Sequence, residues 1–357
     1  MLPEDPQRVV DRLREFQRAV RDLVVRSRGA PQDLHTVTRT SSADTIYAID
    51  AEVDPLLEEF CREWSCTTPL VLIAEGLEDE QGREGPKVFP EGSRESDARI
   101  RLIVDPIDGT RGIMYDKRPA WSLAAVAPNK GPLSRLRDCE VSVMSELPTS
   151  KMGFADVLWA TKDRGARGRR VDLTSLDAID LPLKPSQAEG IDHGFATVSN
   201  FFPGTKVLAS AMIEHLVRHL IGPADVTRAT VFDDQYISTG GQFYELIVGH
   251  DRFNADLRPA FYAAQRLGEG MCCHPYDCAG LLVAEEAGVI VTDARGQPLD
   301  APLDTTTGVS WVAYANPRLR ARIEPLVLEY LERIEPAESQ KENGRGRDPG
   351  ASPPRLR

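Results

Sequence analysis

The sequence lacks a surplus of basic residues. Its 357 residues include 43 lysines and arginines against 55 aspartates and glutamates, which gives a formal net charge of −12. Binding along a nucleic-acid backbone or on an anionic membrane requires clustered positive charge, so this balance argues against both kinds of partner. A small phosphorylated metabolite held through metal ions remains possible, because clustered acidic side chains bind divalent cations.

Long hydrophobic runs are also missing. The longest apolar pieces, such as "LVLIA" and "SLAAVA", have the length of a strand, whereas about 18 apolar residues are needed to span a bilayer. The N-terminal stretch "MLPEDPQRVVDRLREFQ" is charged and amphipathic, which is not the pattern of a signal peptide. We therefore expect a cytoplasmic protein that does not bind membranes.

Cysteine is scarce, with six residues in the chain. In a protein without a secretory signal, this number predicts reduced thiols. The segment "CCHPYDC" at 272–278 gathers three of them beside a histidine, but Cys-Cys-His in succession lacks the two-residue spacing of zinc ligands. Zinc is therefore not predicted there.

Periodicity predicts the regular structure. Apolar residues at the helical period indicate helices at 5–28, at 41–64 with a cap near Ser42 or Asp44, at 205–220, within 231–249, at 277–288 and at 318–334. Short apolar runs bounded by Gly and Pro indicate strands at 69–76, 98–106, 120–128, 138–148 and 194–204. Hairpins are predicted at 154–173, with the turn at 165–168, and at 289–300.

The order of these elements predicts a layered α/β protein with two sheets. Two helices and then mainly neighbouring strands fill residues 1–195, whereas strand and helix alternate over 196–335. We therefore expect an N-terminal α+β domain and a C-terminal α/β domain with these bounds. Residues 336–357 are polar and rich in Gly and Pro, which predicts a disordered tail.

Two aspartates stand three positions apart in "RLIVDPIDGTRG", directly after an apolar run. Pro106 restricts the backbone around it and Gly109 allows a tight turn, so Asp105, Asp108 and the Ile107 carbonyl can converge. Oxygen ligands of this kind suit Mg²⁺, and the N–H groups that follow can face a phosphate. The alternative is an ordinary turn in which Asp accepts local backbone hydrogen bonds, and this segment alone does not decide.

Two further acidic residues favour the metal site. Glu75 ends the apolar strand in "LVLIAEG", and Asp277 in "PYDCAG" begins a predicted helix. Taken singly, Glu75 could be a surface residue and Asp277 a helix N-cap. Their combination with the aspartate pair, in this order along the chain, changes the balance between the two readings.

This ordered set of motifs resembles the inositol monophosphatase-like superfamily of metal-dependent phosphatases, of the inositol monophosphatase and fructose-1,6-bisphosphatase type. Its members carry Glu after an apolar strand, then Asp-Pro-(Ile/Leu)-Asp-Gly-(Thr/Ser), then Trp-Asp-x-Ala-Gly opening a late helix. Here "LIAEG", "VDPIDGTR" and "PYDCAG" follow in that order, and "DTIYAID" looks like a further upstream motif. The resemblance covers about residues 10–333 and implies the sugar-phosphatase fold, an αβαβα sandwich of alternating helix and sheet layers.

The resemblance implies roles for the matching residues. Glu75, Asp105 and the Ile107 carbonyl would hold one metal ion, and Asp105, Asp108 and Asp277 a second. Two or three Mg²⁺ ions are implied, and Mn²⁺ fits the same oxygen ligands.

The catalytic pair would be Glu75 and Thr110, which orient and deprotonate the attacking water. Asp50 would lie behind the metal ions or near a weak third one. The predicted substrate-binding residues surround the phosphate and the ring that carries it: Asp108, Gly109, Thr110, Arg111, Gly240 and Gly241.

Some positions depart from the family pattern or stay unassigned. Tyr276 stands where relatives have Trp, and Gly76 where they often have a second Glu. The acid that grips substrate hydroxyls in relatives is not located here, and Asp256 and Glu269 are the candidates. Arg111, Lys117 and Arg118 form either a solvated basic surface or a site for a second anionic group of the substrate. His250 and His274 are interpreted as structural residues.

The sequence therefore predicts a Mg²⁺-dependent phosphomonoesterase that hydrolyses a small phosphorylated polyol or sugar similar to inositol 1-phosphate. Fructose 1,6-bisphosphate, a nucleotide 3′-phosphate and histidinol phosphate are alternative substrates. A non-catalytic relative that binds metal and phosphate is the alternative outside enzymes. A homodimer is implied by the resemblance alone.

Overall fold

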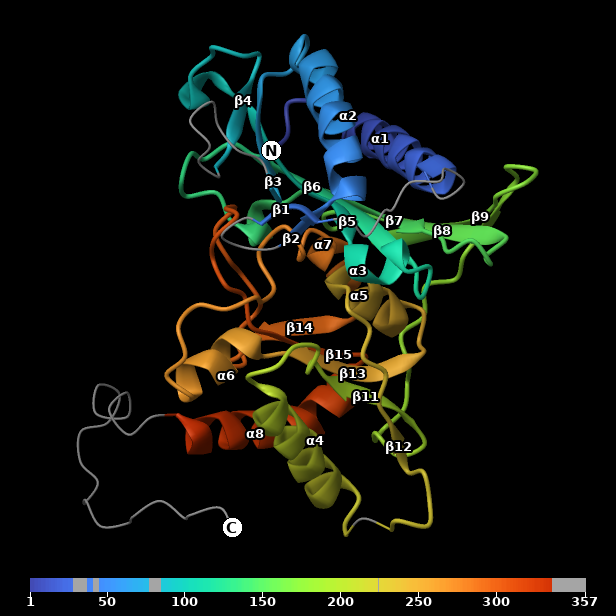
Figure 1. Cartoon of the computed structure of the whole chain (residues 1–357), viewed down its shortest axis with the longest axis vertical. Helices are drawn as coiled ribbons and strands as arrows, with labels where there is room; N and C mark the ends of the chain where they lie inside the picture. Colours follow the sequence, from blue (N-terminus) through green and yellow to red (C-terminus); the bar gives the residue numbers. More distant parts are fainter. Residues whose placement is uncertain (28–36, 41–44, 77–84, 224, 336–357) are drawn as a thin grey trace.

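A computed structural model describes residues 1–27, 37–40, 45–76, 85–223 and 225–335, with backbone alone at 37–40 and 45–51. Helix and sheet layers alternate from one end of the molecule to the other (Figure 1). This α+β layered arrangement confirms the predicted αβαβα class. The division of the chain at residue 195 stays a prediction, and the predicted tail lies outside the described residues.

The first sheet has eight strands in the order β10-β9-β8-β7-β6-β5-β3-β4. β3 and β5 run parallel, and the other neighbours run antiparallel. The strands are β3 Leu70–Ala74, β4 Lys87–Phe89, β5 Ile100–Asp108, β6 Ala120–Pro128, β7 Val141–Leu147, β8 Phe154–Thr161, β9 Ala166–Asp172 and β10 Ala178–Asp180. A separate two-stranded ribbon consists of β1 Val37–Thr40 and β2 Thr45–Tyr47.

The second sheet has five strands in the order β12-β11-β13-β15-β14. Its strands are β11 Gly194–Val198, β12 Val231–Phe232, β13 Asp251–Asp256, β14 Ile290–Asp293 and β15 Trp311–Tyr314. β13 and β15 were not predicted from the sequence, because each is short and buried and lies in a segment of mixed polarity.

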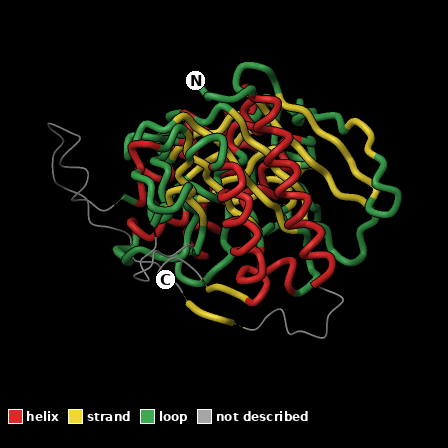
Figure 2. Tube along the Cα trace, turned by 90° about the horizontal axis from the view of Figure 1, so that it is seen from above, coloured by secondary structure: helices red, strands yellow, loops and turns green. Residues whose placement is uncertain are grey.

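Three pairs of helices cover the sheets. α1 Pro6–Ser27 and α2 Ala48–Ser65 lie side by side on the outer face of the first sheet (Figure 2). α5 Thr239–Ile247 and α7 Leu281–Glu286 lie between the sheets, and α4 Lys206–Leu220 and α8 Pro317–Ile334 pack on the far side of the second. The short elements are α3 Thr110–Met114, α6 Arg258–Ala264 and the 3₁₀ turns Glu95–Asp97 and Leu136–Asp138. No described helix is both long and apolar enough to cross a bilayer.

The strands of the first sheet divide their side chains between two cores. Along β3, Leu70, Leu72 and Ala74 face the core beneath α1 and α2. Val71 and Ile73 face the core that the central helices share with the second sheet. Because both faces are covered, these strands are continuous apolar runs, which is why the sequence predicts them well.

Several predicted boundaries are wrong, and the strand predicted over 194–204 ends at Val198. The second helix begins at Ala48, because β2 occupies the residues directly before it. The hairpin turn after β8 closes at Gly165, and Gly168 is already paired with Leu158 inside β9. The late helix begins at Leu281, so Asp277 lies in the turn that precedes α7.

Candidate active site

A β-bulge allows Asp105 and Asp108 to share one pocket. Asp105 pairs with Leu123 of β6 and Asp108 with Trp121, so three steps along β5 match two along β6. Without the bulge, side chains three residues apart would point to opposite faces of the sheet. The strand therefore runs two residues past its predicted end at Pro106, a residue type that strands tolerate at bulges.

Asp108 is buried against the N-terminus of α5. Its carboxylate accepts hydrogen bonds from the Ser238 hydroxyl at 2.9 Å, the Thr239 N–H at 3.3 Å and the Gly240 N–H at 2.5 Å. Ser238 is also the N-cap of α5, and its hydroxyl oxygen accepts from the Gly241 N–H at 2.8 Å. The first turn of α5 thus fixes the orientation of this carboxylate.

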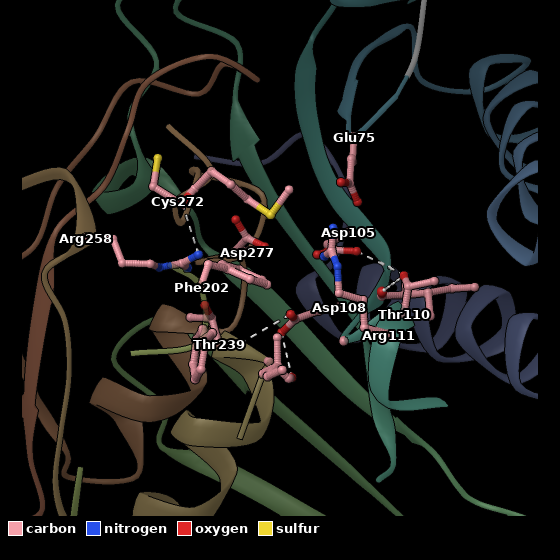
Figure 3. A pocket seen from close by; sticks show the side chains of 16 residues that line it. Glu75, Asp105, Asp108, Thr110, Arg111, Phe202, Thr239, Arg258, Cys272 and Asp277 are labelled. Carbon is pink, nitrogen blue, oxygen red and sulfur yellow. Dashed lines mark hydrogen bonds between the residues drawn. The ribbon is translucent and has the colours of Figure 1, made fainter. Parts of the chain in front are cut away.

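Three carboxylates meet in the pocket. One oxygen each of Asp105, Asp108 and Asp277 lies within 4.8 Å of the others. Asp277 accepts a hydrogen bond from the His274 N–H at 2.5 Å, which orients it from the turn before α7. Glu75, directly after β3, lines the same pocket and points toward Asp105 (Figure 3).

Burial and mutual repulsion raise the pKa of two of these groups. Burial first, and then the charges of Glu75, Asp108 and Asp277, hold the pKa of Asp105 well above its ordinary value. Burial raises the pKa of Asp108 to about 7, although the hydrogen bonds from α5 oppose this shift. A divalent cation among the carboxylates would remove the repulsion, and their hard oxygens fit Mg²⁺ or Mn²⁺.

The turn after β5 forms another wall of the pocket. Gly109 has φ +98°, and a side chain there would also approach the Ile237 carbonyl oxygen and the Ser238 Cβ at 3.1 Å. The Thr110 hydroxyl donates to the Ile107 carbonyl oxygen at 2.8 Å. Thr110 and Arg111, the first residues of α3, line the pocket beside Ile107, as the sequence led us to expect.

Gly240 and Gly241 lie in the first turn of α5. A Cβ on Gly240 would approach the Leu123 Cδ2 atom at 2.6 Å and the Asp108 Oδ2 atom at 3.0 Å. A Cβ on Gly241 would collide with the ring of Tyr236 at 2.4 Å. Close packing within the protein therefore requires glycine at both positions, and their contact with substrate stays a prediction.

Some sequence candidates do not line the pocket. Asp256 is fully buried and its carboxylate binds the Arg258 guanidinium, while Glu269 is exposed. Arg118 forms an ion pair with Asp234 and covers the ring of Tyr236. The others are Lys117, which is exposed, His250, which bonds Glu245, and His274, whose ring stacks on Tyr276. Asp50 lies in the first turn of α2, but its side chain is outside what the structure describes.

Sequence reasoning missed an aromatic and cationic wall. Phe201 and Phe202, in the loop between β11 and α4, line the pocket together with Arg258. The Arg258 guanidinium carbon lies 5.2 Å from the ring centre of Phe201 and 5.5 Å from that of Phe202, and Arg111 lies 5.3 Å from the Phe202 ring. Arg111 and Arg258 are 147 positions apart in the sequence, so no local pattern could have indicated that both lie against the Phe202 ring.

Comparison with known proteins identifies the fold. No protein-family model and no curated sequence matches the chain. The inositol monophosphatase of Thermotoga maritima matches with a TM-score of 0.58 at 16% identity, covering 91% of this chain and 98% of its own. The extragenic suppressor protein SuhB of Bartonella henselae matches with a TM-score of 0.58 at 17% identity, covering 89% and 98%.

A third similar structure is the fructose-1,6-bisphosphatase of Leishmania major, with a TM-score of 0.62 at 12% identity over 90% of this chain and 93% of that one. At identities this low, the likeness establishes a fold and leaves the substrate undetermined. The protein has the fold of the inositol monophosphatase-like superfamily.

Proposed function

We propose that the protein is a Mg²⁺-dependent phosphomonoesterase acting on a small phosphorylated polyol or sugar. The observation that carries the proposal is the cluster of Asp105, Asp108 and Asp277, whose oxygens lie within 4.8 Å of one another beside Glu75. Buried carboxylates this close cannot all ionise without a cation. The fold that places them is shared with structures described as phosphatases.

Glu75, Asp105 and the Ile107 carbonyl would hold one ion, and Asp105, Asp108 and Asp277 another. Bound there, Mg²⁺ would supply Lewis acidity that lowers the pKa of water and stabilises charge on a phosphoryl group. Mn²⁺ would fit the same donors.

The residues of the chain would supply orientation and proton transfer. The Thr110 hydroxyl, which donates a hydrogen bond to the Ile107 carbonyl oxygen, would help to orient the attacking water. Glu75 would take the proton of that water as the new P–O bond forms. The ester P–O bond would break as the alcohol oxygen takes a proton from solvent, which yields inorganic phosphate and an alcohol.

The size of the pocket supports a small substrate. Its cavity volume is about 60 Å³, and its wall carries Arg111 and Arg258 beside two aromatic rings. This wall suits a metabolite with a compact polar body. Fructose 1,6-bisphosphate, a nucleotide 3′-phosphate and histidinol phosphate remain alternative substrates. The homodimer and cytoplasmic location stay predictions.

The test is phosphate release from a panel of inositol, sugar, bisphosphate, nucleotide and histidinol phosphates, with and without Mg²⁺. We expect Mg²⁺-dependent turnover that Asp105→Asn reduces by at least about a thousandfold. Asp192→Asn, which removes an exposed carboxylate away from the pocket, is the matched control. Full activity of Asp105→Asn at saturating Mg²⁺ would overturn the metal assignment. Silence across the panel with intact Mg²⁺ binding would favour the non-catalytic alternative.

A further inference from the structure

A second cavity lies between α1 and the first sheet, on the face that α5 and α7 do not cover. Its volume is about 340 Å³, within the range of sites for small organic ligands. Its lining includes Arg14, Arg18 and Arg21 of α1 and the apolar residues Val157, Val171 and Leu176, of which Leu176 is exposed. No residue lines both this cavity, which we call the arginine cavity, and the carboxylate pocket.

The three arginines share one side of α1 because they are spaced four and three residues apart. Arg14 is held in place by Trp159, whose ring centre lies 4.5 Å from the guanidinium carbon. Arg18 is exposed at the rim, and Arg21 is 5% exposed. The helix thus presents a row of positive charge that runs from solvent into the cavity.

Arg21 differs from the other buried arginines of the described chain. Arg101 bonds Glu95 and Asn129, and Arg258 is held by both carboxylate oxygens of Asp256. Arg21 has no hydrogen bond or ion pair with a described residue. Burial lowers its pKa, Asp22 opposes this shift and the neighbouring Arg18 adds to it. An arginine still remains charged at neutral pH, so the cavity contains a nearly buried cation that has no partner among the described residues.

The acidic residues at the cavity do not neutralise this charge. Asp11 accepts a hydrogen bond from the Gln7 amide at 3.0 Å, and Glu15 is exposed. Neither of them forms an ion pair with the three arginines in the described part of the chain. Leaving a buried charge unpaired is unfavourable, and an anion that binds beside it would recover part of that free energy.

We propose that the arginine cavity binds a small organic anion with a phosphoryl or carboxylate head and an apolar body. Guanidinium groups bind both heads through paired, charge-assisted hydrogen bonds. Val157 and Val171, with the exposed Leu176 beside them, offer apolar surface to an apolar body, which bare phosphate lacks. The site is separate from the carboxylate pocket and requires no metal ion.

Phenylphosphonate is a suitable probe because its C–P bond resists hydrolysis and its ring supplies an apolar body. The full-length protein would first be freed of metal with EDTA and dialysed to remove the chelator, so that cations in the carboxylate pocket cannot attract the probe, and would then be titrated calorimetrically. Thermal unfolding would be followed in parallel against NaCl at equal ionic strength. We expect saturable binding with a rise in melting temperature, and weaker binding of methylphosphonate. Benzoate would show whether a carboxylate head is also accepted.

Variants locate the binding. Arg21→Met should weaken phenylphosphonate binding at least about tenfold and raise the melting temperature of the free protein, because it removes an unpaired buried charge. Arg18→Gln changes an exposed position and should weaken phenylphosphonate binding about threefold. If Arg21→Met does not fold, the binding measured for Arg18→Gln tests the proposal. Arg8→Met, an exposed arginine of the same helix outside the cavity, should bind like the wild type. The proposal would be overturned if phenylphosphonate had no effect beyond that of NaCl. It would also be overturned if Arg21→Met and Arg18→Gln both bound phenylphosphonate as tightly as the wild type does.

Discussion

The carboxylate pocket and the arginine cavity lie on opposite faces of the first sheet, and each gathers like charges. They differ in how the chain builds them. The carboxylates come from the ends of β3 and β5 and from the turn before α7, so the complete fold must bring them together. The arginines come from one helix, and their spacing alone places them on one side of it. The position of a charged side chain can therefore be predicted from its own segment of the sequence. Whether its charge is neutralised depends on the groups that the fold packs against it.

The largest expected effect comes from disturbing the assembly of the carboxylate pocket without touching a carboxylate. Gly240→Ala would drive a Cβ against Leu123 and the carboxylate of Asp108. We expect turnover to fall at least about a hundredfold and the free energy of unfolding to fall by about 1–3 kcal/mol. Gly153→Ala, where a Cβ would meet no atom within 4 Å, is the control. Equal activity of the two variants in a phosphate-release assay would contradict the inference that the first turn of α5 positions the Asp108 carboxylate.

Glu146 is a buried carboxyl group outside both regions, and a proton can neutralise it. Burial, and after it the charge of Asp156, raises its pKa to about 8, against the hydrogen bond from the Asp156 N–H. Because the folded pKa lies above the unfolded value, its contribution is fully present below about pH 4.5 and is lost as the pH rises toward 8. We expect Glu146→Gln to reduce the loss of unfolding free energy between pH 5 and pH 8 by about 2 kcal/mol in urea denaturation. An unchanged pH slope would show that Glu146 is ionised in the folded protein.

A smaller effect separates helix capping from support of the pocket. Ser238→Ala removes the cap of α5 and a hydrogen-bond donor to Asp108. We expect a loss of about 1 kcal/mol in unfolding free energy and a higher Mg²⁺ requirement for turnover. Asn316→Ala removes the cap of α8 and should destabilise by a similar amount while leaving the Mg²⁺ requirement unchanged. An equal Mg²⁺ requirement in both variants would mean that Ser238 acts only as a cap.

The smallest expected effect is the coupling between the two regions. Since no residue lines both, Arg21→Met should change the Mg²⁺ concentration that gives half-maximal turnover by less than about twofold, which corresponds to less than about 0.5 kcal/mol of coupling. Phosphate release titrated with Mg²⁺ in the wild type and in the variant measures the difference. A larger coupling would show that the first sheet transmits a change in one region to the other.

Much of the fold could be predicted from residues that interact locally. β3 is a continuous apolar run and β6 nearly so, and α1, α4 and α8 carry a helical period. The failures occur where local preference competes with packing. "DCAGLLVAEEAG" has a helical pattern from Asp277 onward, yet its first residues form turns that direct Asp277 into the pocket.

The candidate site shows the same division. Glu75, Asp105, Ile107, Asp108, Thr110, Arg111 and Asp277 all line the pocket that the motifs predicted, although their roles in catalysis await the assays above. Arg258 and Phe202 could not be predicted, because their contact depends on how the loop after β11 meets the start of α6.

The sequence by itself determined which residue types are available: hard oxygen ligands in a fixed order, glycines beside them and a row of arginines on one helix. The tertiary structure alone decided which charges are buried together. It placed the β5 bulge opposite β6, set the N-terminus of α5 against Asp108 and left Arg21 of α1 without a carboxylate partner among the described residues. The physical reason is that electrostatic free energy depends on distance and on exclusion of water, and both are properties of the packed molecule.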